Sequence, residues 1–356
     1  MKKGTPLWKA LLLEHRLPWR YKNALEKTQL YFSWKVHNIV SGFYHLRKKR
    51  KILICSRIKV NGGSTISLSL LANELSKKFN VIIKADRDSA FIKNVNFNIK
   101  LTTQLLDSDF YIYHTRILDN LAKEANSLIK AGKKVIFSIH ELDIKSKKLL
   151  EIFSKAYLVR FVGNYQKNFI RYHKKNGVVI PNTVGKIRKR KKTSNIGFLG
   201  RLYVRSKNMQ AVVRIFNLSE SRELYLWGGT EKIQKKYQRN KNIKIMSWER
   251  NQNKVYDSFN ILTNMSKYDE TFSRTVVEAM SIGMPCILSN IPAHKAFKDC
   301  PGIILINPKN YKESVKKVNY LLKNEEQLKP KIVDYFKKHY SKEDIMKKWF
   351  KILEVK

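Results

Sequence analysis

Two glutamates, Glu270 and Glu278, stand eight positions apart in a stretch whose pattern predicts a ligand site. Residues 259–264 form an apolar run with strand character, and residues 273–282 predict a helix that ends at Gly283. At about 100° per residue, this spacing leaves the carboxylates only ~80° apart around the helix axis, so both can face one ligand. A helix that begins at the carboxyl end of a strand offers N–H groups to a phosphate. The carboxylates beside it are better suited to sugar or ribose hydroxyls.

The string around these glutamates resembles the signature of an enzyme family. Glu270 and Glu278 are followed by A-M-S-I-G-M-P (279–285), and the whole is similar to the E-x7-E signature of retaining GT-B glycosyltransferases of family four. The resemblance implies that Glu270 contacts the hydroxyls of the donor sugar and that Glu278 holds the ribose of the nucleotide. The alternative is a buried amphipathic helix whose two glutamates are merely solvated.

The loop before this helix is Thr271-Phe272-Ser273, and it is expected to contact the donor at the helix N-terminus. Thr271 and Ser273 are candidate N-cap residues. Ser273 departs from the resembled family, in which a glycine three residues after the first glutamate is usual. Its Cβ would crowd the pyrophosphate, or its hydroxyl would contact it.

Length and composition predict two ordinary domains. The 356 residues exceed what one hydrophobic core usually serves, and 43% apolar with 11% aromatic residues is ample for two cores. Cys55, Cys286 and Cys300 have neither metal-ligand spacing nor a disulfide framework. Two of them lie in apolar surroundings, which favours small core residues and is consistent with a reducing cytosol.

The formal net charge of +44 favours anionic partners: nucleic acid, acidic lipid surfaces or phosphorylated glycans. No apolar run reaches the roughly 18 residues that a transmembrane helix needs. The leucines 11–13 are followed at once by charged residues, so no signal peptide is expected. We therefore expect a cytoplasmic protein, with peripheral attachment at the inner face of the cytoplasmic membrane.

Residues 1–50 read as a basic, aromatic-rich N-terminal extension. Between Leu30 and Leu46 apolar residues recur at near-helical spacing, and the basic run 47–51 follows directly. Such an amphipathic segment can lie in a membrane interface. The alternative is an arm that packs on the body of the protein or is swapped with a second copy.

The first domain opens with a βαβ pattern. A buried strand at 51–56 leads to Gly62 and Gly63, a helix over 65–78 and a strand at 80–83. The glycines stand where backbone approaches a ligand in such a unit, although the G-x-G-x-x-G fingerprint is absent and a plain turn explains them equally well. In the resembled family this loop faces the donor phosphates and the acceptor.

Two histidines follow predicted strands of this domain, His114 after 110–113 and His140 after 134–139. A lone histidine is more often structural than catalytic, but two at successive strand ends favour a functional role. His140 is the stronger candidate, because the resembled family carries an active-site histidine near the donor sugar at that place. A neutral imidazole there would bond to a sugar hydroxyl or the acceptor.

The second half restarts the α/β rhythm with a strand at 195–199 followed by Gly200-Arg201-Leu202. With Lys207 this resembles the G-R-L … K motif, in which the arginine and the lysine hold the donor diphosphate. Arginine offers a bidentate fork to a phosphate and lysine a mobile point charge. Gly228 ends the strand at 224–227 and matches a loop on the nucleotide side.

These patterns predict an α/β protein of GT-B architecture, with two doubly wound Rossmann-like domains facing each other across a cleft. Further helices are expected at about 310–323, 325–338 and 342–353. The predicted segments, in chain order, are an extension (1–50), an acceptor-side domain (51–184), a basic linker (185–194), a nucleotide-sugar domain (195–340) and a C-terminal helix crossing back to the first domain (341–356).

The function that follows is transfer of a sugar from a nucleotide-diphosphate sugar to a glycan or lipid-linked hydroxyl with retention. No cofactor or metal is expected, because Arg201 and Lys207 would replace a metal and no Asp-x-Asp triplet calls for one. The acceptor is expected to be anionic and membrane-linked, as in bacterial lipopolysaccharide or capsule synthesis, near an acidic membrane surface. The alternatives are a basic nucleic-acid-binding protein, although no specific nucleic-acid motif is found, and a non-catalytic membrane-associated scaffold.

Overall fold

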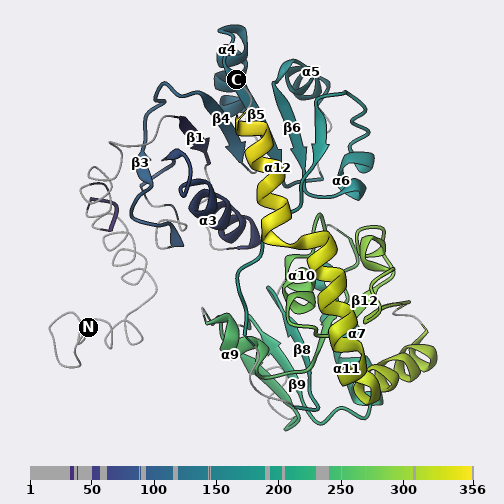
Figure 1. The fold of residues 1–356 in the computed structure, drawn as a ribbon. Coiled ribbons are helices and arrows are strands. Elements are labelled where there is room, and N and C mark those ends of the chain that lie inside the picture. The colour runs from purple at the N-terminus through teal and green to yellow at the C-terminus, as the bar shows by residue number, and fades with distance from the viewer. Residues whose placement is uncertain are drawn as a thin grey trace, which may run out of the picture. The chain divides into compact units, whose positions relative to one another are not determined.

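The computed structural model in Figure 1 divides the chain into two compact units. The first is Met1–Ile139 with Lys155–Val159, and the second is His140–Ser154 with Arg160–Lys356. The predicted domain boundaries stay a prediction. The structure describes residues 33–35, 38, 50–56, 62–87, 89, 94–114, 119–142, 144, 146–188, 193–202, 205–229, 240–249, 251–268, 270–307 and 310–354.

The first sheet has seven strands in the order β3-β2-β1-β4-β5-β6-β7. Its strands are β1 (Lys51–Cys55), β2 (Asn80–Lys84), β3 (Lys100–Thr102), β4 (Phe110–His114), β5 (Lys134–Ile139), β6 (Leu158–Phe161) and β7 (Gly177–Val179). The helices between them are α3 (Gly63–Leu75), α4 (Asp119–Lys130), α5 (Lys147–Lys155) and α6 (Asn164–Phe169). These strands are continuous apolar runs in the sequence, because helices cover both faces of a parallel sheet and bury the side chains on each. Strands β1 and β4 are parallel neighbours, and the order of the strands reverses between them. This reversal is typical of a doubly wound sheet.

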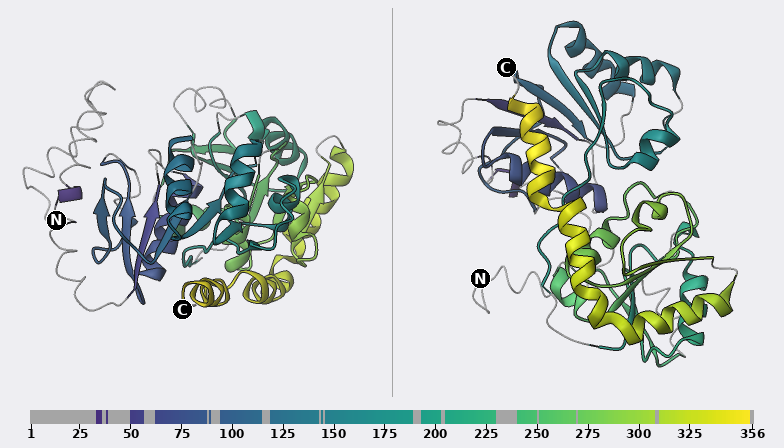
Figure 2. Two further views of the ribbon diagram at one scale, coloured as in Figure 1. Left: turned by 90° about the horizontal axis from the view of Figure 1, so that it is seen from above. Right: turned by 45° about the vertical axis from the view of Figure 1, so that its right-hand side comes forward.

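The second sheet has six strands in the order β10-β9-β8-β11-β12-β13. Its strands are β8 (Ile196–Leu199), β9 (Leu224–Trp227), β10 (Ile243–Met246), β11 (Ile261–Asn264), β12 (Cys286–Ser289) and β13 (Ile303–Ile306). The helices in this half of the chain are α7 (Met209–Leu218), α9 (Gln252–Tyr256), α10 (Arg274–Ser281), α11 (Tyr311–Tyr340) and α12 (Lys342–Glu354), with short turns η3 (Arg205–Lys207) and η4 (His294–Phe297). In Figure 2, α12 is the yellow helix that leads to the C-terminus. The order reverses between β8 and β11, so the carboxyl ends of these strands are where a ligand is expected.

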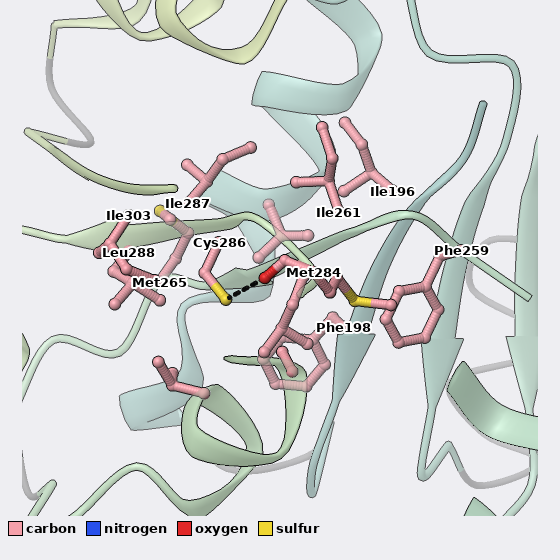
Figure 3. Close-up of a cluster of buried hydrophobic side chains, with 14 of the residues drawn as sticks. Ile196, Phe198, Phe259, Ile261, Met265, Met284, Cys286, Ile287, Leu288 and Ile303 are labelled. Carbon is pink, nitrogen blue, oxygen red and sulfur yellow. Dashed lines mark hydrogen bonds between the residues drawn. The ribbon is translucent and has the colours of Figure 1, made fainter. Parts of the chain in front are cut away.

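The core under this switch point is close-packed (Figure 3). A Cβ added to Gly197 of β8 would lie 2.1 Å from the ring of Phe259, so the ring occupies the place of a side chain. Cys286 is fully buried in the same core, and burial raises the pKa of its thiol well above the ordinary value. Burial likewise raises the pKa of Cys55 to about 12 and that of Cys300 to about 11. The prediction that the cysteines are core residues is confirmed.

The predicted break near residue 324 is wrong, because one helix, α11, runs through it and contains Pro330. Pro330 is exposed, whereas Leu321, Leu328 and Ile332 are buried on the other face. This apolar stripe continues across the proposed break and holds the helix together despite the missing backbone N–H. Tertiary packing therefore outweighs the local signal.

Most of the N-terminal extension lies outside the described residues. Of the described part, Trp34 is buried, with 6% of its surface exposed. The Asn38 side-chain oxygen accepts a bond of 2.9 Å from the backbone N–H of Leu101 in the edge strand β3. The burial of Trp34 and this hydrogen bond favour, for the described residues, an arm that packs on the body of the protein. No helix in the described ranges is both long and apolar enough to cross a membrane.

Candidate functional site

Glu270 and Lys207 form an ion pair beside the N-terminus of α10. Lys207 ends η3, and Glu270 lies in the loop between β11 and α10. The Ser266 hydroxyl lies 3.0 Å from Glu270 Oε1 and 2.8 Å from Asn264 Oδ1, two acceptors that share its single proton, and the Ser273 hydroxyl lies 3.3 Å from Glu270 Oε2. Burial raises the pKa of Glu270, but the charge and hydrogen bond of Lys207 outweigh it and hold the pKa below its ordinary value. The structure thus brings together a predicted sugar-binding carboxylate and a predicted phosphate-binding cation.

Ser273 adopts a left-handed backbone conformation, with φ 49° and ψ 61°, immediately before α10. It takes the N-cap position but makes no side-chain cap bond, so the cap prediction is right in place and wrong in mechanism. A left-handed residue with a Cβ is strained, and glycine is not. The turn geometry accounts for the glycine that the resembled family carries here.

Replacing Ser273 by glycine should therefore make the protein more stable than replacing it by alanine. Both changes remove the hydroxyl that lies near Glu270, but only alanine keeps the Cβ strain. We expect Ser273→Gly to exceed Ser273→Ala by about 1 kcal/mol in unfolding free energy. Urea denaturation of the two variants measures the difference, and equal stabilities would contradict the assigned strain.

Glu278 lies within α10 with 3% of its surface exposed. Arg274 Nη2 contacts its Oε1 at 2.6 Å, and the Tyr256 hydroxyl donates to its Oε2 at 2.9 Å. Burial and the neighbouring carboxylate raise the pKa of Tyr256 well above its ordinary value, which keeps this hydroxyl a donor. Arg274 Nε is buried without a hydrogen-bond partner among the described residues. Glu278 is therefore a compensated buried charge, not a solvated helix residue.

Two glycine turns meet at the carboxyl ends of β8 and β9. Gly228 has φ +99°, and an added Cβ would lie 2.2 Å from the carbonyl oxygen of Gly200. Gly200 N–H donates to Trp227 O at 3.1 Å, and Gly228 N–H to Met246 O at 3.0 Å. Only glycine fits where the two turns approach so closely. Arg201 follows Gly200 and is exposed at this edge of the sheet.

Thr271 and Phe272 line a cavity of ≈ 510 Å³ in the second unit. The Phe272 ring is buried and packs edge-on against Tyr340 at 6.2 Å between ring centroids. The cavity volume is within the range of small-molecule sites. Gly62 and Gly63 begin α3 in the first unit, and an added Cβ at Gly63 meets nothing within 4 Å. Their contact with a donor stays a prediction.

His140 follows β5 and bonds to a buried arginine. Arg160 Nη1 lies 3.1 Å from His140 Nε2, and because a guanidinium only donates, Nε2 accepts and the neutral ring carries its proton on Nδ1. Arg160 also donates to Ile180 O at 2.7 Å and to Asn182 Oδ1 at 2.9 Å, and it lies 5.8 Å from the Trp349 ring centroid. Burial lowers the pKa of Arg160 to about 9.

Sequence reasoning did not select Arg160, which is 2% exposed. Its signal was a charged residue within the apolar strand β6, because a buried arginine is rare unless it is bonded. It ties Asn182 and helix α12 to the predicted catalytic histidine. His114, the weaker candidate, is buried at the end of β4. The roles of both histidines stay predictions.

In the described part of the chain, no three His, Cys, Asp or Glu side chains gather where they could hold a metal ion. The charged groups at the carboxyl edge of the second sheet are instead the Lys207–Glu270 and Arg274–Glu278 pairs. Such an arrangement can bind an anion through cations and helix N–H groups, and hydroxyls through carboxylates.

Residues 193–324 match the family model described as Glycosyl transferases group 1. The match contains Lys207, Glu270 and Glu278. This part of the chain is therefore similar to the group 1 glycosyl transferases, in agreement with the family resemblance of the sequence, whereas the retaining mechanism and the roles of the two glutamates stay predictions. Among curated proteins, none matches the sequence.

Solved structures with the same fold are glycosyltransferases of GT-B architecture, which confirms the predicted fold class. HepE from Anabaena, in complex with UDP and glucose, is 13% identical over 86% of this chain and 100% of its own, with TM-score 0.71. Sucrose-phosphate synthase from Thermosynechococcus elongatus is 12% identical over 86% and 98%, with TM-score 0.70. A glycosyltransferase from Rickettsia africae is 14% identical over 86% and 100%, with TM-score 0.68.

Proposed function

We propose that the chain is a retaining, metal-independent glycosyltransferase that uses a nucleotide-diphosphate sugar as donor. The observation that carries the proposal is the Lys207–Glu270 pair at the N-terminus of α10, within the group 1 glycosyl transferase match. The pair holds a cation and a carboxylate beside the backbone N–H groups that begin the helix. This combination suits a ligand that carries phosphate and hydroxyls together.

In the proposed reaction, negative charge develops on the leaving diphosphate, and its stabilisation carries much of the catalysis. Arg201, Lys207 and the N–H groups at the start of α10 take that role. Arg201 contributes its guanidinium from the turn after β8. Lys207 is paired with Glu270, and a bound diphosphate would share its charge.

The remaining site residues orient the two substrates. Glu270 accepts hydrogen bonds from donor-sugar hydroxyls, and Glu278 from the ribose. His140 contacts the sugar or the acceptor, and its ring is oriented by the bond between Nε2 and Arg160. The Gly228 turn and the Thr271–Ser273 loop approach the nucleotide and the phosphates. No residue is assigned as a nucleophile, which agrees with front-side transfer.

We further propose an anionic, membrane-linked glycan as acceptor, as in lipopolysaccharide or capsule synthesis in bacteria. The support is the net charge of +44, which attracts acidic lipids and phosphorylated glycans. The protein would then work at the inner face of the cytoplasmic membrane as a peripheral protein. The HepE structures contain UDP, UDP-glucose or UDP with glucose, which makes uridine donors the first to test.

The experiment that tests this function is donor turnover with Arg201→Ala beside the wild type. Release of UDP, GDP or ADP from the corresponding nucleotide-sugars is measured in EDTA with a crude lipid-linked glycan fraction as acceptor. We expect the variant to lose about 10²-fold in rate while its unfolding free energy changes by less than about 0.5 kcal/mol, because Arg201 is exposed. An Arg201→Ala protein with wild-type turnover would refute the leaving-group role. Salt-dependent binding of arbitrary DNA or RNA, with no turnover, would instead favour a nucleic-acid-binding protein.

A further inference from the structure

His294 is a buried imidazole that the proposed reaction does not use. It begins η4, five residues after the end of β12, and it is fully buried. Nδ1 lies 3.0 Å from Ser289 O and 3.2 Å from Ser289 Oγ. Because a carbonyl oxygen only accepts, Nδ1 must carry the proton, and burial lowers the pKa of the ring so that it is neutral.

The other nitrogen, Nε2, is buried with no hydrogen-bond partner among the described residues. A buried polar atom without a partner is destabilising, and an apolar side chain of similar size would avoid that cost. Packing alone therefore does not explain a histidine at this place. The explanation must come from what Nδ1 does.

The Nδ1–H group leads to Glu270 through two serines. The single proton of the Ser289 hydroxyl is donated to the Ser266 carbonyl at 2.5 Å, so this hydroxyl is free to accept from His294. The Ser266 hydroxyl lies 3.0 Å from Glu270 Oε1 and 3.3 Å from Lys207 Nζ. Hydrogen bonds thus lead from the buried imidazole through Ser289 to the main chain of Ser266, and the side chain of this same residue contacts the Lys207–Glu270 pair and, at 2.8 Å, Asn264 Oδ1.

The segment that contains Ser266 has no regular secondary structure of its own. Residues 265–267 join β11 to the Glu270 loop, so their backbone groups depend on outside partners. Ser266 N–H bonds to Asn264 Oδ1 at 3.2 Å, and Lys267 N–H to Ser206 O at 2.8 Å. The third support is Ser289, whose hydroxyl is oriented by His294.

We infer that His294 is a positioning residue for Glu270, acting through the Ser289 hydroxyl and the main chain of Ser266. The inference rests on the proposed function, in which Glu270 contacts the donor sugar while Glu278 contacts the ribose. Loss of the His294 support should therefore weaken recognition of the sugar and leave recognition of the nucleotide intact. A purely structural histidine would affect both or neither.

The test compares each nucleoside diphosphate with its sugar nucleotide by calorimetry: UDP and UDP-glucose, GDP and GDP-mannose, ADP and ADP-glucose. His294→Leu removes the hydrogen-bond donor Nδ1–H, and Ser289→Ala removes the hydroxyl that joins His294 to Ser266. His294→Asn keeps an N–H near the place of Nδ1. Thr263→Val is the matched control, because the Thr263 hydroxyl on neighbouring β11 is buried without a partner in the described structure. Circular dichroism confirms folding, and if His294→Leu does not fold, the other two variants carry the test.

The measured quantity is the Kd of the sugar nucleotide divided by the Kd of its nucleoside diphosphate, for the nucleotide that the wild type binds. This ratio should rise about tenfold in His294→Leu and in Ser289→Ala, which is equivalent to roughly 1.4 kcal/mol. The diphosphate Kd should stay within about twofold, His294→Asn should recover most of the ratio, and Thr263→Val should match the wild type. Unchanged ratios in the folded variants, or no recovery by asparagine, would overturn the inference and leave the proposed function standing. A wild type that binds none of these nucleotides would overturn the function and the inference together.

Discussion

Replacing Lys207 by methionine is expected to lower the rate of sugar transfer by about 10²- to 10³-fold, the usual effect of removing one donor to a developing anion. Lys207 Nζ is paired with Glu270 at the N-terminus of α10, where the leaving diphosphate is proposed to bind. The Lys207 side chain is 26% exposed but its partner Glu270 only 12%, so some loss of stability accompanies the change and turnover is compared for the folded proteins. Donor turnover at saturating acceptor measures the effect.

Two further variants make this result specific. Lys207→Arg keeps the positive charge and should retain part of the rate. Lys244→Met removes another ion-paired lysine of the same domain, held 3.4 Å from Glu223, which directly precedes the neighbouring strand β9, and should leave turnover unchanged. A Lys207→Met enzyme within about threefold of the wild type, or an equal loss in Lys244→Met, would contradict the assigned role.

The Lys207→Met variant should also shift the acid side of the pH–rate profile. In the wild type, burial raises the pKa of Glu270, but Lys207 lowers it below its ordinary value. A carboxylate with a lowered pKa contributes stability above its unfolded pKa, and this contribution is lost as pH falls through the folded pKa. Without Lys207 the pKa of Glu270 rises, so activity and stability should both fail at a higher pH. Overlapping profiles for the two proteins would count against the pairing.

Replacing Glu278 by alanine is expected to have the largest effect on stability, about 3–5 kcal/mol, and to abolish nucleotide binding as well. Glu278 is 3% exposed and holds Arg274 Nη2 at 2.6 Å. Its removal leaves the Arg274 charge buried without its carboxylate, which is the most costly way to break such a pair. Thermal unfolding and nucleotide titration measure the two effects.

Stability and binding can be separated at this position. Glu278→Gln keeps an acceptor for the Tyr256 hydroxyl, which lies 2.9 Å from Oε2, and should fold well enough for titration. The double variant Arg274→Met with Glu278→Leu removes both charges and should regain most of the lost stability. Neither variant should recover nucleotide affinity if Glu278 holds the ribose. Wild-type affinity in either one would refute that assignment.

Much of the second domain could be predicted because its signals are local. Apolar runs fixed the strands, and Gly283 marked the end of α10. The motif spacing selected Glu270 and Lys207, and the structure pairs them directly. The left-handed conformation of Ser273 could not be predicted, and the sequence showed only that serine replaces the usual glycine of the motif. A residue type other than glycine does not indicate a left-handed backbone.

The partners of the selected residues could not be predicted, because packing brings them from distant parts of the chain. Tyr256 reaches Glu278 from α9, and His294 acts on Glu270 through Ser289 of β12 and Ser266 of the loop after β11. Arg160 was hidden inside an apolar strand, where its bonds to Asn182 and His140 depend on the folded sheet. The unbroken α11 has the same cause, since its buried face outweighs Pro330.

The most direct test of the central claim is calorimetric titration of UDP, GDP, ADP and CMP into the purified protein in EDTA, repeated with Glu278→Gln. A nucleotide-diphosphate donor site without a metal predicts selective binding of one diphosphate by the wild type, lost in the variant. Binding that appears only when a divalent cation is added would contradict the metal-independent site. Absence of selective binding under both conditions would contradict the glycosyltransferase function itself.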